Sequence, residues 1–306
     1  MKILACSSAR NFVDNLERFG RRDILYTEVT SFADGEKLVK IRDQQVLQGD
    51  RVLVVQSLAG NVNDSLMELL FALDIVRNSV PAKVYLLITY MGYSRQDRVE
   101  SLSDAFSARV VAQLLSLNFI DRLFVVDLHA PQSLGFFSIP SINLNSDEFI
   151  LEEIRNNYNL DEVLLVSPDT GNVKSIISIA NQIGAEYSIA IKYRPRANEN
   201  KILSLVGYDV SDRVCIIIDD IVDSGGTLCN VAERLTNKGA KDVIAYITHP
   251  VLSEGARERI DNSYLTKLFI SDSIDAREKV ANSKKVQIFS LADWCLENIL
   301  RQGREI

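Results

Sequence analysis

Short apolar runs alternate with longer amphipathic stretches along the whole chain. Runs such as 51–57 and 214–220 consist largely of valine, leucine and isoleucine without polar alternation, which is typical of strands covered on both faces of a parallel sheet. The longer stretches carry apolar residues at helical spacing. Strands are predicted at 51–57, 84–90, 123–127, 141–144, 162–167, 187–192, 214–220 and 243–248, and helices at 64–78, 105–117, 173–183, 227–237 and 292–301. The pattern indicates an α/β protein.

The order of these elements suggests two related domains. A chain of 306 residues has room for two, and the element order of the first 145 residues is similar to that of the following 145. A strand at 141–144 meets a new helix that starts at Ser146, so we predict domains at 1–145 and 146–306. The final helix, 292–301, can pack on either domain.

Composition narrows the class of protein. Hydrophobic residues make up 47% and charged residues 25%, as in soluble globular proteins, and no apolar run is long enough to span a bilayer. The net charge of −7, with dispersed basic residues, disfavours binding to nucleic acid. Only two histidines are present, which argues against a multi-histidine zinc site. Four scattered cysteines and the lack of a secretory leader predict a cytoplasmic protein.

The segment from Asp219 to Thr227, DDIVDSGGT, is the sharpest chemical signal. A buried strand ends in two carboxylates, and Gly225 and Gly226 then lead into an amphipathic helix. Glycines let backbone N–H groups converge on an anion, and a helix N-terminus adds further N–H groups. Carboxylates do not bind phosphate, so Asp219 and Asp220 should contact sugar hydroxyls or a magnesium ion. The simpler alternative is a tight turn with a capping aspartate.

This segment resembles the phosphoribosyl-pyrophosphate loop of type I phosphoribosyl proteins, in the form found in ribose-phosphate pyrophosphokinases. Further blocks match that family in order, at 32–36, 90–98, 126–130 with 135–137, and 167–171. The resemblance implies two tandem type I phosphoribosyltransferase-like domains, each a mainly parallel sheet flanked by helices. The N-terminal domain would serve ATP and the C-terminal domain ribose 5-phosphate.

The implied reaction transfers the β,γ-pyrophosphate of MgATP to the C1 hydroxyl of ribose 5-phosphate, giving phosphoribosyl pyrophosphate and AMP for nucleotide biosynthesis. The resemblance assigns catalysis to Lys192 and Arg194, with Arg196 as a weaker candidate. ATP would contact Phe32, Asp34, Glu36, Arg95, Gln96 and His129, the first three reaching a neighbouring subunit. Ribose 5-phosphate would contact Asp219, Asp220, Asp223, Ser224, Gly225, Gly226 and Thr227. Mg²⁺ would lie near His129 and Asp169, and the protein would form a homo-oligomer of dimers, as in hexameric relatives.

Two of these motifs have simpler interpretations. His129, taken alone, would be a buried structural histidine, and the cations from Lys192 to Arg196 would be a solvated strand edge. The segment 98–107 departs from the family pattern because it has no cation between Arg98 and Arg109, which predicts weak regulation by phosphate or ADP. Asn172 replaces a residue that is frequently glycine or alanine in the pyrophosphate-binding segment of the family. A non-catalytic regulatory homologue and a phosphoribosyltransferase remain as alternatives.

Overall fold

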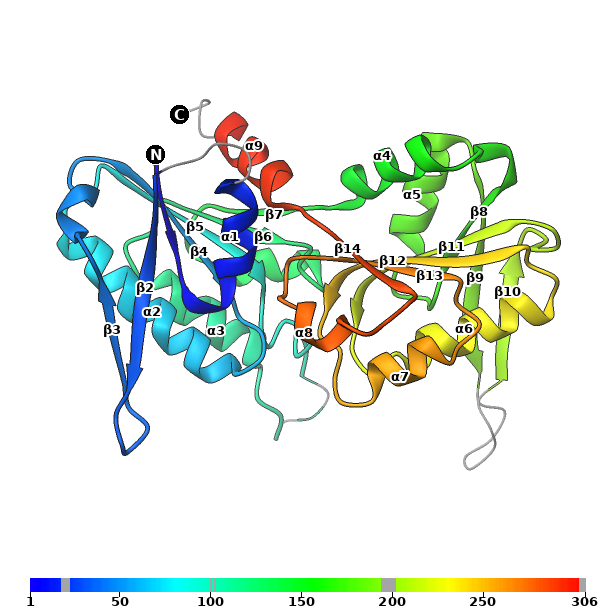
Figure 1. Ribbon diagram of the computed structural model, residues 1–306, viewed down its shortest axis with the longest axis horizontal. Coiled ribbons are helices and arrows are strands. Elements are labelled where there is room, and N and C mark those ends of the chain that lie inside the picture. The colour runs from blue at the N-terminus through cyan, green and yellow to red at the C-terminus, as the bar shows by residue number, and fades with distance from the viewer. Residues whose placement is uncertain (18–22, 100, 102, 194–201, 303–306) are drawn as a thin grey trace. The chain divides into compact units, whose positions relative to one another are not determined.

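The structure is a computed structural model that describes residues 1–17, 23–99, 101, 103–193 and 202–302 (Figure 1). The chain divides into two compact units. The first contains Met1–Asn145, Asp272–Asp275 and Ser290–Ile306, and the second contains Ser146–Ser271 and Ala276–Phe289. None of the described helices is both long and apolar enough to cross a membrane.

The first unit is built on a mainly parallel sheet. Its strands are β1 (Lys2–Ala5), β2 (Ile24–Ser31), β3 (Lys37–Ile41), β4 (Arg51–Ser57), β5 (Lys83–Tyr90), β6 (Arg122–Val126) and β7 (Ser141–Leu144). They lie in the order β3-β2-β1-β4-β5-β6-β7, and in the described residues only the β2–β3 pair is antiparallel. The helices are α1 (Arg10–Glu17), α2 (Val62–Asn78), α3 (Ser107–Ser116) and α9 (Ala292–Gln302), with short 3₁₀ turns at Ser7–Ala9, Gln44–Leu47 and Pro131–Phe136.

The second unit repeats this arrangement. Its strands are β8 (Val163–Ser167), β9 (Glu186–Tyr193), β10 (Ile202–Gly207), β11 (Val214–Val222), β12 (Asp242–Pro250), β13 (Lys267–Ser271) and β14 (Val286–Phe289). The order β10-β9-β8-β11-β12-β13-β14 matches that of the first sheet position by position. The helices are α4 (Asp147–Asn157), α5 (Val173–Ile183), α6 (Gly226–Asn237), α7 (Ala256–Asp261) and α8 (Arg277–Val280), with a 3₁₀ turn at Leu160–Glu162. The predicted fold class is therefore confirmed.

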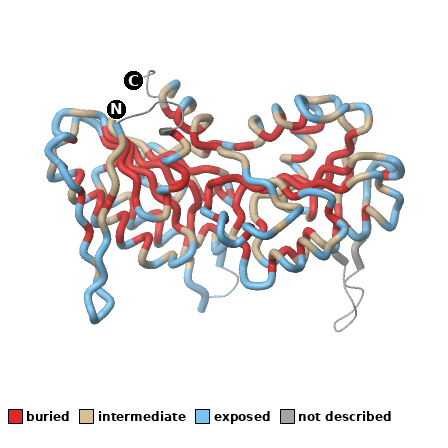
Figure 2. The backbone as a smooth tube through the Cα atoms, viewed as in Figure 1, coloured by how far each residue is buried: buried red, intermediate tan, exposed pale blue. Residues whose placement is uncertain are grey.

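Burial explains why the central strands were the easiest to recognise. In β4, β5, β8 and β12 nearly every residue is buried, and Figure 2 shows this continuous buried layer along both sheets. Amphipathic helices cover the sheets; α2, for example, buries Leu66, Leu69 and Leu73 on one face. Each of these central strands is thus apolar on both sides, which gives the uninterrupted apolar runs seen in the sequence.

The chain returns to the first unit twice near its C-terminus. The carbonyl oxygen of Ser273 accepts hydrogen bonds from Ser57 Oγ at 2.9 Å and Thr89 Oγ1 at 2.7 Å. Ser57 ends β4 and Thr89 lies near the end of β5. The segment Asp272–Asp275 therefore covers the carboxyl ends of these two strands, and α9 packs beside α1 in the same unit.

Asp272 is a buried carboxyl group at this junction. It accepts hydrogen bonds from Asn15 Nδ2 at 2.6 Å, Ser290 Oγ at 2.5 Å and the Leu291 N–H at 2.9 Å. Burial raises its pKa to about 6, although these three donors partly oppose the shift. Through these hydrogen bonds, Asp272 connects the segment that follows β13 with α1 and with the start of α9.

We expect Asp272 to make stability fall as the pH rises from about 4 to 7. Between its ordinary pKa and about 6, the folded state holds a proton that the unfolded chain has released. The decline attributable to this carboxyl should be about 3 kcal/mol. Urea unfolding of the wild type and of Asp272→Asn across this range tests it, since the difference in stability between them should change by that amount. The exposed Asp74→Asn should show no such change, and a pH-independent difference for Asp272→Asn would contradict the expectation.

Candidate active site

The second sheet has a topological switch point between β8 and β11. From β8 the chain continues to β9 on one side, whereas from β11 it continues to β12 on the other. Ligands of open α/β sheets bind in the crevice at the carboxyl ends of such a strand pair. Asp169 follows β8, and Asp219 and Asp220 lie near the end of β11. The structure therefore brings three predicted site residues to the same end of the sheet.

The turn that carries Asp169 is held in place by short polar contacts. Ser167 Oγ donates to the Asp169 carbonyl oxygen at 2.7 Å, and the Gly171 N–H donates to Asp169 Oδ1 at 2.8 Å. Asn172 Nδ2 donates to the carbonyl oxygen of Ile218 at 3.0 Å. This last bond fastens the turn to β11 directly before Asp219. Asn172, noted in the sequence only as a departure from the family pattern, thus acquires a structural role.

The electrostatics around Asp219 favour a cation or hydrogen-bond donors. The pKa of Asp219 is raised well above its usual value, first by burial and then by the neighbouring charges of Asp220 and Asp169. Within the described residues, no group of three or more His, Cys, Asp or Glu side chains is arranged to hold a metal ion by itself. Mg²⁺ commonly takes only one or two carboxylates and completes its shell with water and phosphate oxygens. The carboxylates here fit that mode of binding.

The glycine turn after β11 has the geometry expected for an anion site. Gly225 has φ of 74°, in the left-handed region that other residues rarely adopt. It is also packed closely, because a Cβ atom there would lie 3.3 Å from Ile260 Cγ1. Helix α6 then starts at Gly226 and buries Leu228, Val231, Ala232 and Leu235, as predicted. The N–H groups of its first turn are directed toward the carboxyl end of the sheet.

In the first unit, Arg95, Gln96 and His129 lie beyond the carboxyl ends of neighbouring strands. Arg95 and Gln96 follow β5, His129 follows β6, and the two strands are parallel partners. Gln96 Oε1 accepts a hydrogen bond from Ser107 Oγ at 2.5 Å at the start of α3. Arg95 and His129 are both exposed. The exposure of His129 excludes the alternative of a buried structural histidine.

The loops that carry these residues contain strained or crowded backbone. Asp127, two residues before His129, has φ of 37°, and the next N–H, that of Leu128, donates to Asn143 Oδ1 at 2.7 Å. Gly92 precedes Arg95, and a Cβ atom on it would lie only 2.6 Å from the Leu58 carbonyl oxygen. Strained positions persist where surrounding structure fixes them, and they gather at functional sites.

The predicted adenine-contacting residues Phe32, Asp34 and Glu36 form the turn of the β2–β3 hairpin. The Phe32 N–H donates to the Glu36 carbonyl oxygen at 2.8 Å, and the Glu36 N–H donates to Asp34 Oδ1 at 3.1 Å. The Phe32 side chain is 52% exposed, which leaves the ring available for stacking.

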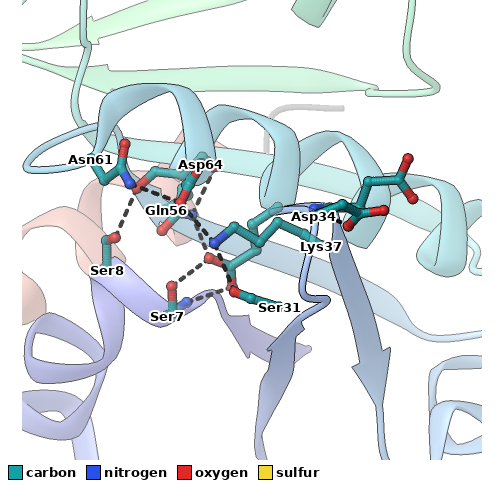
Figure 3. A network of polar contacts seen from close by, with 11 residues as sticks. Ser7, Ser8, Ser31, Asp34, Lys37, Gln56, Asn61 and Asp64 are labelled. Atoms are coloured by element: carbon teal, nitrogen blue, oxygen red, sulfur yellow. Dashed lines mark hydrogen bonds and ion pairs between the residues drawn. The ribbon is translucent and has the colours of Figure 1, made fainter.

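Lys37 anchors the base of this turn. Its Nζ lies 2.8 Å from Asp64 Oδ2 on the first turn of α2 and 2.9 Å from Ser31 Oγ. Figure 3 shows Lys37 pointing toward Ser31 and Asp64, with Asn61 donating to the same carboxylate at 2.8 Å. The sequence did not single out Lys37 or Asp64 as site-supporting residues.

The hairpin turn and the residues after β5 and β6 belong to strands that are not neighbours in the first sheet. Strands β1 and β4 separate β2 from β5, a lateral distance of roughly 14 Å at the usual spacing between strands. The contribution of the turn to a site on a neighbouring subunit, which the family resemblance implies, stays a prediction.

Of the predicted catalytic cations, only Lys192 lies within the residues that the structure describes. Lys192 lies in β9, which pairs in parallel with β8 and antiparallel with β10. Its backbone is thus on the strand next to the one that precedes Asp169. Arg194 and Arg196 lie outside the described residues. Their assignment stays a prediction.

Comparison with known proteins gives the family. Residues 1–117 match the N-terminal domain of ribose phosphate pyrophosphokinase, and residues 138–280 match the phosphoribosyl transferase domain. The chain is 40% identical to the ribose-phosphate pyrophosphokinase of Brucella melitensis over 100% of its own length and 97% of the relative's. It belongs to the ribose-phosphate pyrophosphokinase family.

Other members of the family agree along the full chain. The ribose-phosphate pyrophosphokinase of Rhizobium meliloti is 39% identical, again over 100% of this chain and 97% of the relative. The crystal structure of phosphoribosylpyrophosphate synthetase from Mycobacterium smegmatis superposes with a TM-score of 0.89 at 28% identity, covering 99% of this chain and 98% of the other. The resemblance stated from the motifs is confirmed.

Proposed function

We propose that this chain transfers the β,γ-pyrophosphate of ATP to the C1 hydroxyl of ribose 5-phosphate and releases AMP. The observation that carries the proposal is the shared position of Asp169, the Asp219–Asp220 pair and the glycine turn at one switch point. Carboxylates can accept hydrogen bonds from hydroxyls, and the N–H groups of the adjacent glycine turn can bind a phosphate, so the arrangement suits a molecule that has both. Relatives of nearly the same length are named for this reaction.

The sugar phosphate is assigned to β11 and α6. Backbone N–H groups from Ser224 to Thr227 would bind the 5-phosphate, helped by the Ser224 and Thr227 hydroxyls. Asp219 and Asp220 would accept hydrogen bonds from the ribose hydroxyls, and their half-buried position favours such neutral donors over bulk water.

ATP is assigned to Arg95, Gln96 and His129, with the Phe32–Glu36 turn supplied by a second copy. Phe32 would stack on the adenine, while Asp34 and Glu36 would accept from its exocyclic amine. When bound, Mg²⁺ would neutralise charge on the phosphate oxygens, with His129 and Asp169 as the residues beside it. Lys192 and Arg194 would stabilise the charge that grows on the transferred and leaving oxygens.

The remaining assignments follow from these. We propose a homo-oligomer built from dimers, as the family resemblance implies, in which the Phe32–Glu36 turn of one copy serves the nucleotide site of another. We propose the cytoplasm as its location, consistent with Cys6, Cys215 and Cys295 being buried thiols without disulfides. Regulation by phosphate or ADP should be weak, since residues 99–108 contain no cation.

Release of AMP from purified protein, MgATP and ribose 5-phosphate tests the function. We expect wild-type protein to release AMP only when both substrates are present, and Asp220→Asn to raise the KM for ribose 5-phosphate about tenfold or more with less effect on ATP. The exposed Asp212→Asn, in the loop before β11, is the matched control and should behave as wild type. A wild-type protein that releases no AMP would instead support the non-catalytic homologue.

A further inference from the structure

The loop that is proposed to bind the sugar phosphate is supported from behind by one continuous segment of the chain. Three consecutive carbonyl oxygens of the loop accept hydrogen bonds from it. Val222 accepts from the Leu252 N–H at 3.1 Å, and Asp223 accepts from the Ser253 N–H at 3.2 Å. Ser224 accepts from Nη1 of Arg259, the one side chain among the three donors.

Peptide geometry makes the direction of these carbonyls important. In a trans peptide, the C=O of one residue and the N–H of the next point in opposite directions, and no cis peptide occurs among the described residues. A carbonyl directed toward the supporting segment therefore turns the following N–H away from it. The N–H groups of Asp223, Ser224 and Gly225 are thus aimed at the side of the loop where the anion is expected.

The supporting segment is itself firmly held. Leu252 is buried and has φ of 46°, a conformation that is unfavourable for a leucine and persists only where its surroundings impose it. Ile260 is fully buried and packs against Gly225. Helix α7, which carries Arg259 and Ile260, packs beside α6 (Figure 1), and Cys229 Sγ on α6 donates to the Arg259 carbonyl oxygen at 3.7 Å.

We propose that Arg259 is a positioning residue for ribose 5-phosphate: it fixes the Ser224–Gly225 peptide so that the Gly225 N–H faces the 5-phosphate. The proposal rests on the proposed function. Gly225 has no Cβ, so rotation about its N–Cα bond, which turns the preceding peptide, is only weakly restricted, and its φ is 74°. The Arg259 guanidinium opposes that rotation from outside the site, and it does so without contacting the substrate.

Arg257 provides a matched control on the same helix. Its guanidinium pairs with Glu258 and Asp261, both on α7, so these ion pairs stay within the helix. Replacing either arginine by methionine keeps the aliphatic stem and removes the donors. A lysine at position 259 restores a cation and a donor.

The test measures ribose 5-phosphate binding by calorimetry together with steady-state kinetics. We expect Arg259→Met to weaken ribose 5-phosphate binding and to raise its KM about fivefold, with kcat and the KM for ATP unchanged. Arg259→Lys should recover part of the affinity, and Arg257→Met should match the wild type.

The outcomes separate the two levels of the proposal. Suppose that the wild-type protein binds ribose 5-phosphate and releases AMP, and that Arg259→Met has the same affinity and KM for ribose 5-phosphate. The positioning role is then overturned, and the proposed function stands. Equal losses for both substrates, together with a lower melting temperature, would also overturn it, because they indicate a purely structural residue. A wild type that does not bind ribose 5-phosphate overturns the proposed function and the positioning role with it.

Discussion

A Lys192→Ala variant should retain its affinity for ribose 5-phosphate but turn over about a hundredfold more slowly. Lys192 lies in β9, next to the strand that leads into the Asp169 turn. As a cation directed at the transferred pyrophosphate, it would interact more strongly with the transition state than with the bound sugar. Loss of such an interaction lowers kcat and kcat/KM together.

Rates of AMP release across both substrate concentrations, with direct binding of ribose 5-phosphate, measure this effect. Lys238→Ala, at the exposed end of α6, is the matched control and should leave both quantities unchanged. If Lys192→Ala weakens sugar binding as much as it slows turnover, Lys192 contributes to substrate binding in general. The catalytic assignment would then be wrong.

The second large effect is expected on stability, at Glu68. This carboxylate on α2 is only 2% exposed. It accepts hydrogen bonds from the Ser7 N–H at 2.7 Å, from Thr27 Oγ1 at 2.5 Å and from Gln56 Nε2 at 3.3 Å. Ser7 Oγ is a fourth donor. Figure 3 shows Ser7 and Gln56 within this network.

Glu68→Ala should lower the free energy of unfolding by about 4 kcal/mol, because it leaves four polar groups without their acceptor in a buried setting. Glu68→Gln should lose less, since one amide oxygen can still accept. Denaturant unfolding measures both, and Glu297→Ala, on the exposed face of α9, serves as the control. A Glu68→Ala protein as stable as that control would show that these donors find other partners.

Glu68 also shows how the two units differ although their sheets share one strand order. Two of its partners, Ser7 and Gln56, lie just after β1 and near the end of β4, the strands that flank the switch point of the first sheet, and the third, Thr27, lies in β2. In the second unit the corresponding end of the sheet carries the Asp169 turn and the glycine loop, which we propose for the sugar phosphate. The first unit has at this place a buried carboxylate with its hydrogen-bond donors.

The central strands and most helices could be predicted because their signals are local. β4 and α5 were predicted with the bounds that the structure shows. The β2–β3 hairpin and strands β10, β13 and β14 were not predicted. β2, β3 and β14 mix exposed and buried positions. They lie at or next to a sheet edge and lack the continuous apolar run of a strand covered on both faces.

The sequence by itself determined the α/β class, the repeated element order and the chemistry of the segment from Asp219 to Thr227, because each is written in residues that are close together in the chain. Only the tertiary structure decided what supports that chemistry. Asn172 reaches Ile218 across 46 positions, and Arg259 reaches Ser224 across 35. Such contacts depend on which strands become neighbours in the sheet, and no local pattern of apolar and polar residues records that choice.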